Sequence, residues 1–179
     1  MQRAPDMAWL NLVVAIESAA STYVTPRDAF EHWHNGEINK ICLEHGGESL
    51  VLEMVDKLGN TIASRYQYRQ FLASFFPDEP PVRSPLCPIK VWTFDALWPT
   101  LDQIYAERSA LLHDASPMRF SLVGVPAHDG AFRYAERPGA QTFQNPLFKT
   151  TDAPRIQLHL HMFVYLVQAA LLKWVRSLL

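Results

Sequence analysis

Arg108 and His113 are the pair of residues whose types and spacing best fit chemistry on a phosphodiester. An arginine guanidinium is permanently charged and presents a fork of N–H donors that matches phosphate oxygens. A histidine can take or give a proton near neutral pH, and a helix C-terminus favours its protonated form. Together the two groups would suffice to cleave RNA through its 2′-hydroxyl without a metal ion.

The spacing of this pair limits how it can form one site. The two residues lie five positions apart, which on a continuous helix turns their side chains about 140° away from each other. They reach one site if His113 lies at or beyond the helix end, or if a second copy of the chain supplies the complementary pair. The simpler alternative is an Arg–Glu surface pair beside a helix-capping histidine.

The stretch YAERSALLHDA, residues 105–115, resembles the Arg-x4-6-His motif of HEPN domains, and its Arg-Ser form is similar to the Apea-like branch. The stretch WLNLVVAIESAAS near the start, with its Ile-Glu pair, is similar to the first helix of that branch. An apolar C-terminal helix also closes such domains. The resemblance covers most of the chain loosely and residues 105–115 sharply.

This resemblance implies an all-α, HEPN-like helical bundle that forms a homodimer through its motif helices, so that both copies line one cleft. By position, Arg108 would bind and stabilise the scissile phosphate of RNA, and His113 would act as general acid or base, with no cofactor. Typical members are metal-independent endoribonucleases of toxin and antiphage defence systems. Other relatives are inactive scaffolds, so the alternative is a non-catalytic module for dimerisation or for RNA or nucleotide binding in a larger defence system.

Two positions depart from the family pattern. Many HEPN toxins carry Asn, Asp or His directly after the arginine, where this chain has Ser109, a weaker guide for the guanidinium. Toxins paired with nucleotidyltransferase antitoxins usually carry a tyrosine two residues after the histidine, where this chain has Ala115. Silencing by modification of that tyrosine is therefore not expected, and the identity of an antitoxin or defence-system partner stays open.

Two carboxylates could support the pair. Glu17 flanks the apolar stripe of the first expected helix, where a solvated carboxylate would not usually sit, so it either holds Arg108 or another arginine in place or is a rim residue. Asp114 could orient His113 through a hydrogen bond, although adjacent side chains seldom face each other.

Arg65 and Arg69 are one helical turn apart, with Tyr66 and Tyr68 between them. Cations interleaved with aromatic rings can form a phosphate groove in which bases stack, so these arginines are candidate RNA-binding residues. A plain solvated helix face explains the same pattern.

Two histidine pairs, His32 with His34 and His159 with His161, are spaced two residues apart. On a helix that spacing points side chains to different sides, and no cysteine or carboxylate completes a zinc set, so no metal is expected. His159 is expected to be a hydrogen-bonded core histidine on the last helix. An unrelated helical protein that uses these histidines for a metal or small ligand is a third, weaker hypothesis.

Composition favours one globular domain over residues 1–179. The 16 Lys and Arg residues against 18 Asp and Glu give a net charge of −2, so no global field attracts nucleic acid or an anionic membrane. The 2 cysteines lack metal-type spacing and fit a reducing cytosol. No stretch predicts a signal peptide or a membrane span, and a cytoplasmic location follows.

Apolar periodicity predicts five or six helices. The first begins near Pro5, and Thr25 caps a second that Gly46–Gly47 ends. Two more cover residues 49–58 and 61–76, with Gly59–Asn60 between them, before a proline-rich connector at 77–88. A helix from Asp95 or Pro99 runs towards His113, a long loop or small β-hairpin insertion occupies 118–153, and an apolar helix follows Pro154.

Overall fold

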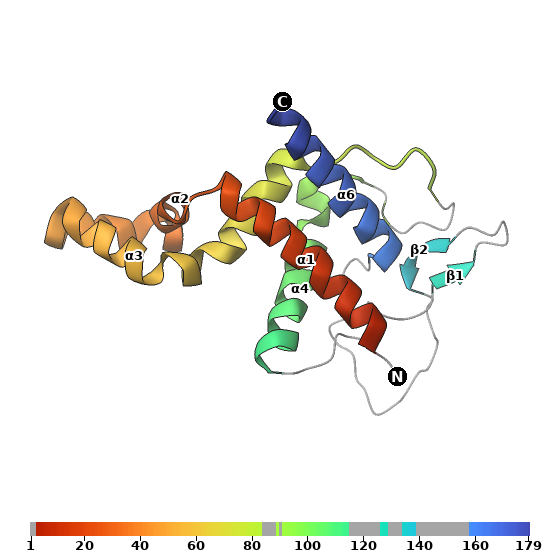
Figure 1. Cartoon of the computed structure of the whole chain (residues 1–179), viewed down its shortest axis with the longest axis horizontal. Helices are drawn as coiled ribbons and strands as arrows, with labels where there is room; N and C mark the ends of the chain where they lie inside the picture. The colour runs from red at the N-terminus through yellow and green to blue at the C-terminus, as the bar shows by residue number, and fades with distance from the viewer. Residues whose placement is uncertain (1–2, 84–88, 90, 115–125, 129–133, 139–157) are drawn as a thin grey trace. The chain divides into compact units, whose positions relative to one another are not determined.

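The computed structural model describes residues 3–83, 89, 91–114, 126–128, 134–138 and 158–179. These residues are mostly helical, which confirms the predicted all-α character. The helical elements are α1 (Arg3–Tyr23), α2 (Pro26–Glu31), the 3-10 turn η1 (Trp33–Gly36), α3 (Glu37–Phe75), α4 (Phe94–His113) and α6 (Leu160–Ser177) (Figure 1).

Two short strands accompany the helices. Strand β1 (Pro126–His128) pairs antiparallel with β2 (Tyr134–Pro138). Both lie within the 118–153 segment for which a loop or hairpin was predicted, and the expected turn at Asp129–Gly130 lies outside the described residues. None of the helices in the described ranges has the length and apolarity that a membrane span requires.

The contacts divide the chain into two compact units. One comprises Met1–Val13 and Phe76–Leu179, and is called the α4/α6 unit below. The other comprises Val14–Phe75 and is called the α2/α3 unit. Each unit is described by itself.

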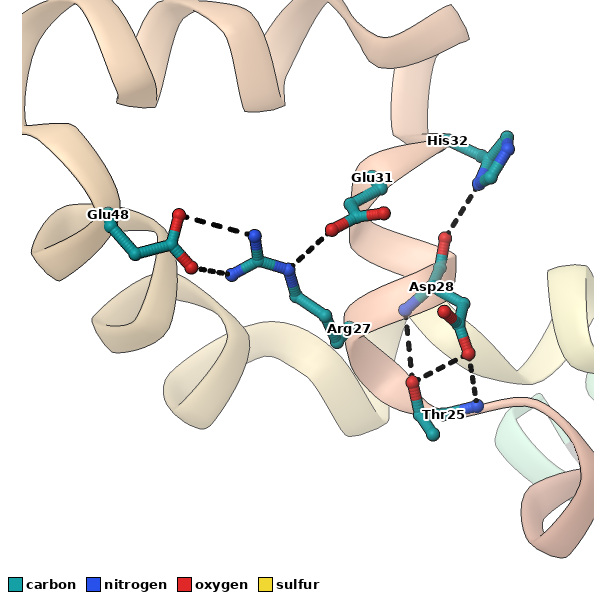
Figure 2. A network of polar contacts seen from close by, with 6 residues as sticks. All are labelled: Thr25, Arg27, Asp28, Glu31, His32 and Glu48. Carbon is teal, nitrogen blue, oxygen red and sulfur yellow. Dashed lines mark hydrogen bonds and ion pairs between the residues drawn. The ribbon is translucent and has the colours of Figure 1, made fainter.

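Helix α2 begins where the sequence predicts, with Thr25 as its N-cap, and the structure shows that the cap is a capping box with Asp28. The Thr25 hydroxyl accepts a hydrogen bond from the Asp28 amide at 3.2 Å, and the Asp28 carboxylate accepts one from the Thr25 amide at 3.0 Å (Figure 2). Pro26 is the first helical residue. Proline lacks an N–H, but at this position an N–H would have no hydrogen-bond partner within the helix. These local bonds satisfy backbone donors that the first turn of any helix leaves open.

The predicted length of this helix is wrong. It ends at Glu31 instead of running to Gly46, because the backbone turns left-handed at His34 (φ 49°) and Asn35 (φ 57°) before Gly36 (φ 82°). Asparagine and glycine tolerate this left-handed conformation. The spacing of apolar residues does not reveal it, so the prediction extended the helix too far. The chain then restarts as α3.

Helix α3 contains one predicted break and lacks the other. At Gly47 the backbone leaves helical geometry (φ 62°, ψ −161°), as expected. At Gly59 the helix continues, so the predicted interruption at Gly59–Asn60 is wrong. Gly59 is buried, and a Cβ atom there would lie 2.9 Å from the Pro26 Cβ. Glycine is needed at this position for close packing rather than for a turn.

The core of the α2/α3 unit forms between α2 and both parts of α3. Phe30, Cys42 and Val51 are buried together at its centre. An ion-pair network closes one side: Arg27 contacts Glu31 at 2.6 Å and Glu48 at 2.7 Å (Figure 2). Partly buried side chains surround the core, namely Trp33, Ile38, Leu50, Met54, Val55 and Ile62.

In the α4/α6 unit, Trp9 of α1 stacks on Phe163 of α6 with ring centroids 4.8 Å apart, and both side chains are fully buried. The apolar stripe of α6 is buried only as far as Ala170, because Val175 and Leu178, which were predicted to continue it, are exposed. Helix α4 begins at Phe94, one residue before the earlier of the two predicted starts, with Thr93 as its N-cap.

Candidate functional site

The candidate site lies at the C-terminal end of α4, which is the lower end of this green helix in Figure 1. The helix ends at His113, and the Asp114 amide donates to the Ala110 carbonyl at 2.9 Å to close the last turn. His113 is exposed. The structure thus places His113 at the helix end, which is one of the two arrangements that would let the pair reach one site, and leaves its side chain exposed to solvent.

Arg108 lies one and a half turns before this end and is half-buried. Its guanidinium carbon lies over the ring of Tyr105, 5.9 Å from the centroid, and its Nε atom is shielded from solvent. The face of an aromatic ring attracts a guanidinium through the quadrupole of the ring. The N–H groups of a guanidinium lie in the plane of the guanidinium itself. The sequence interpretation did not include Tyr105, although its spacing of three residues from Arg108 was a usable signal.

The residues expected to support the pair are placed as follows. Ser109 is half-buried beside Arg108 in α4, and Asp114 is exposed as the C-cap of that helix. Glu17 is half-buried in the part of α1 that belongs to the α2/α3 unit, whereas Arg108 belongs to the α4/α6 unit. A contact between Glu17 and Arg108 therefore stays a prediction.

The proposed RNA groove on α3 needs a correction. Arg65 and Arg69 are exposed, but the Tyr68 side chain is fully buried and cannot stack on a base. Tyr66 stacks on His32 with ring centroids 5.2 Å apart. Burial is the main reason that the pKa of Tyr66 is raised, and the charge of Asp28 acts in the same direction. The two arginines remain candidate cations without the interleaved stacking platform.

Neither histidine pair occupies a single helix as predicted. His32 is the C-cap of α2, where its Nδ1 lies 2.8 Å from the Asp28 carbonyl oxygen (Figure 2), and His34 lies in the left-handed turn. His159 precedes α6 as its N-cap, so its ring can turn towards His161, and the two Nδ1 atoms are 2.8 Å apart. The expectation that the His159 and His161 side chains point to different sides is therefore wrong.

His159 is buried and hydrogen-bonded, which confirms its expected structural character. Because its Nδ1 also accepts from the His161 amide, the short ring contact is best explained with His161 as the donor. Within the described ranges, no group of three or more His, Cys, Asp or Glu side chains could hold a metal ion.

Comparison with known proteins yields no match to the chain among family models, curated proteins or solved structures.

Proposed function

We propose that this protein is a metal-independent endoribonuclease of the HEPN type, acting as a homodimer with a composite active site. The observation that carries the proposal is the position of His113 as the exposed last residue of α4, with Arg108 five residues before it. The resemblance of residues 105–115 to the HEPN motif supports the same assignment. Such an enzyme would act on cytoplasmic RNA as a toxin or antiphage effector, with an antitoxin or defence-system partner.

The chemistry needs only groups that the chain supplies. The RNA 2′-oxygen attacks phosphorus, its proton passes to a general base, and the bond from phosphorus to the 5′-oxygen breaks as a general acid protonates that oxygen. One His113 serves as base and the partner's His113 as acid. Arg108 binds the non-bridging oxygens and stabilises the charge that grows on them.

The geometry of α4 supports a composite site. A single helix points Arg108 and His113 in directions about 140° apart, so one copy presents them to a substrate poorly. Two α4 ends related by a two-fold axis place the arginine of one copy beside the histidine of the other. Exposed Leu112, between the two residues, offers apolar surface for that contact.

A non-catalytic module is the second candidate. Ser109 favours it, because a serine holds the neighbouring guanidinium less firmly than the Asn, Asp or His of many HEPN toxins. In that case the exposed cations Arg65 and Arg69 would serve RNA binding alone.

The deciding experiment is incubation of the purified protein with mixed RNA in EDTA. Cleavage by the wild-type chain should survive chelation and fall by about a hundredfold or more in Arg108→Ala and in His113→Ala, the range found when a charge-stabilising or proton-transfer group is removed. Arg176→Ala and His45→Ala serve as matched controls, because both residues are exposed and lie outside the site.

The controls should cleave like the wild type. Intact RNA in every lane, with retained binding, would leave the non-catalytic module as the function. Cleavage that EDTA abolishes would exclude the metal-independent mechanism.

A further inference from the structure

Residues 37–46 form the first part of α3 and are called the lid segment below. Backbone with positive φ lies at both of its ends: His34, Asn35 and Gly36 precede it, and Gly47 follows it with φ 62° and ψ −161°. The angles of Gly47 are open essentially to glycine alone. Positions of this kind serve as hinges, because a few residues at the end of an element absorb a change in backbone direction.

The lid segment packs weakly against the rest of the α2/α3 unit. Cys42 is the one buried side chain among these described residues, Ile38 is half-buried against the same core, and Ile41 is exposed. The ion pair that the segment contains, Lys40 with Glu44 at 3.9 Å, lies within it and does not reach another element. Apolar contact through Cys42 and Ile38 is therefore what holds the segment in place.

The Asn39 side chain opposes closure of the lid segment. Its Oδ1 atom is buried, and within the described part of the chain it has no hydrogen-bond partner. An amide oxygen in this setting has lost its hydrogen bonds to water and gained none in exchange. Movement of the segment away from the core would let water reach Asn39 again, so this residue favours an open state.

The rest of the unit is joined by contacts that do not involve the lid segment. Arg27 of α2 contacts Glu48, the residue directly after the hinge at Gly47, at 2.7 Å (Figure 2). Further along α3, Gly59 lies against Pro26 at the start of α2. Helix α2 and the second part of α3 can therefore stay together while the lid segment moves.

We propose that residues 37–46 form a lid that opens as a local unit about residues 34–36 and Gly47, and so exposes the apolar core between α2 and the second part of α3. Local opening costs less free energy than global unfolding, because it breaks only the contacts of the moving segment. The proposal is independent of ribonuclease activity. The Cys42 thiol reports on opening, since it is buried while the lid is closed.

The test follows the reaction of Cys42 with dithiodipyridine in the full chain carrying Cys87→Ser, which removes the second of the 2 thiols. Each rate is divided by the rate for the same variant unfolded in urea. Without urea, Cys42 should react about tenfold or more faster than global unfolding, measured by circular dichroism, allows. Low concentrations of urea should change this rate little, because the effect of urea scales with the surface that is exposed.

Two substitutions at Asn39 and one control test the cause. Asn39→Leu removes the unpaired oxygen and should slow the reaction of Cys42 about tenfold. Asn39→Asp keeps the shape and adds a charge that closure must bury, so it should speed the reaction. Thr25→Ala is the control, because it weakens the cap of α2, which stays formed when the lid opens. It should lower the global folding equilibrium constant about fivefold and leave the reaction rate of Cys42 unchanged.

Four results would overturn the lid. The reaction of Cys42 could follow global unfolding throughout the urea series, or become about fivefold faster in Thr25→Ala; either result means that only global unfolding exposes the thiol. Asn39→Leu could react as fast as the wild type, which would remove the unpaired oxygen as a cause of opening. Reaction at the rate of the unfolded chain without urea would mean that the segment does not cover Cys42 at all.

Discussion

Replacement of Gly59 by alanine sets two opposing effects of known size against each other. Alanine is more favourable than glycine inside a helix by about 1 kcal/mol. The added Cβ, however, would lie 2.9 Å from the Pro26 Cβ, well inside the separation of about 3.5–4.0 Å at which carbon atoms pack best. The atom it meets belongs to a rigid proline ring that begins α2, so the neighbour cannot rotate away.

Overpacking of this kind typically destabilises a core by about 1–3 kcal/mol. Subtraction of the helix-propensity gain leaves a net loss of about 1 kcal/mol for Gly59→Ala, with a range of about 0–2 kcal/mol. Urea-induced unfolding of the full chain, followed by circular dichroism, measures this loss as a lowered midpoint.

A double-mutant cycle with Pro26→Gly isolates the contact. That variant removes the Cβ that lies too close and leaves the Val55 Cγ1 at an ordinary 3.5 Å. In this background Gly59→Ala should change sign and stabilise the chain by about 1 kcal/mol, because only helix propensity remains. Stabilisation of the wild-type chain by Gly59→Ala, or an equal effect in both backgrounds, would refute close packing as the reason for this glycine.

Three further predictions concern the α2 cap and the composite site. Thr25→Ala should lower the unfolding free energy by about 1 kcal/mol, measured by urea unfolding, while Thr25→Ser should retain most of it. Hydrogen bonds from the Thr25 side chain and amide hold the pKa of Asp28 below its ordinary value of 3.8. The contribution of the Asp28 carboxylate to the free energy of unfolding is therefore complete above pH 3.8 and disappears as the pH falls through the lower folded-state pKa. Acid should therefore narrow the difference in unfolding free energy between the wild type and Asp28→Ala. A difference that widens in acid would contradict this reasoning. Mixing equal amounts of the wild type and His113→Ala should leave about a quarter of the RNA cleavage, since about a quarter of randomly exchanged dimers keep both histidines of the site. Verified subunit exchange that leaves about half of the cleavage would exclude the composite site.

The amino-acid sequence by itself determined the features that depend on neighbouring residues. Apolar spacing predicted a helix from Asp95 or Pro99 towards His113, and α4 matches it closely enough to place His113 at its end. The Thr25 N-cap of α2 could likewise be predicted directly, because the hydrogen bond that it makes spans three residues. Interactions of this range are fixed by local backbone geometry, whatever the rest of the chain does.

Only the tertiary structure decided which side chains are buried and which distant residues are in contact. Gly59 looks like a helix breaker until Pro26, 33 positions earlier, is seen against it. The sequence predicted Tyr68 as a stacking side chain, but its ring is buried in the core. It also predicted His159 within the last helix, but His159 is the N-cap of α6 and its ring contacts His161. Local pattern reports periodicity and propensity, whereas burial and close contact depend on partners that the fold brings together from distant positions.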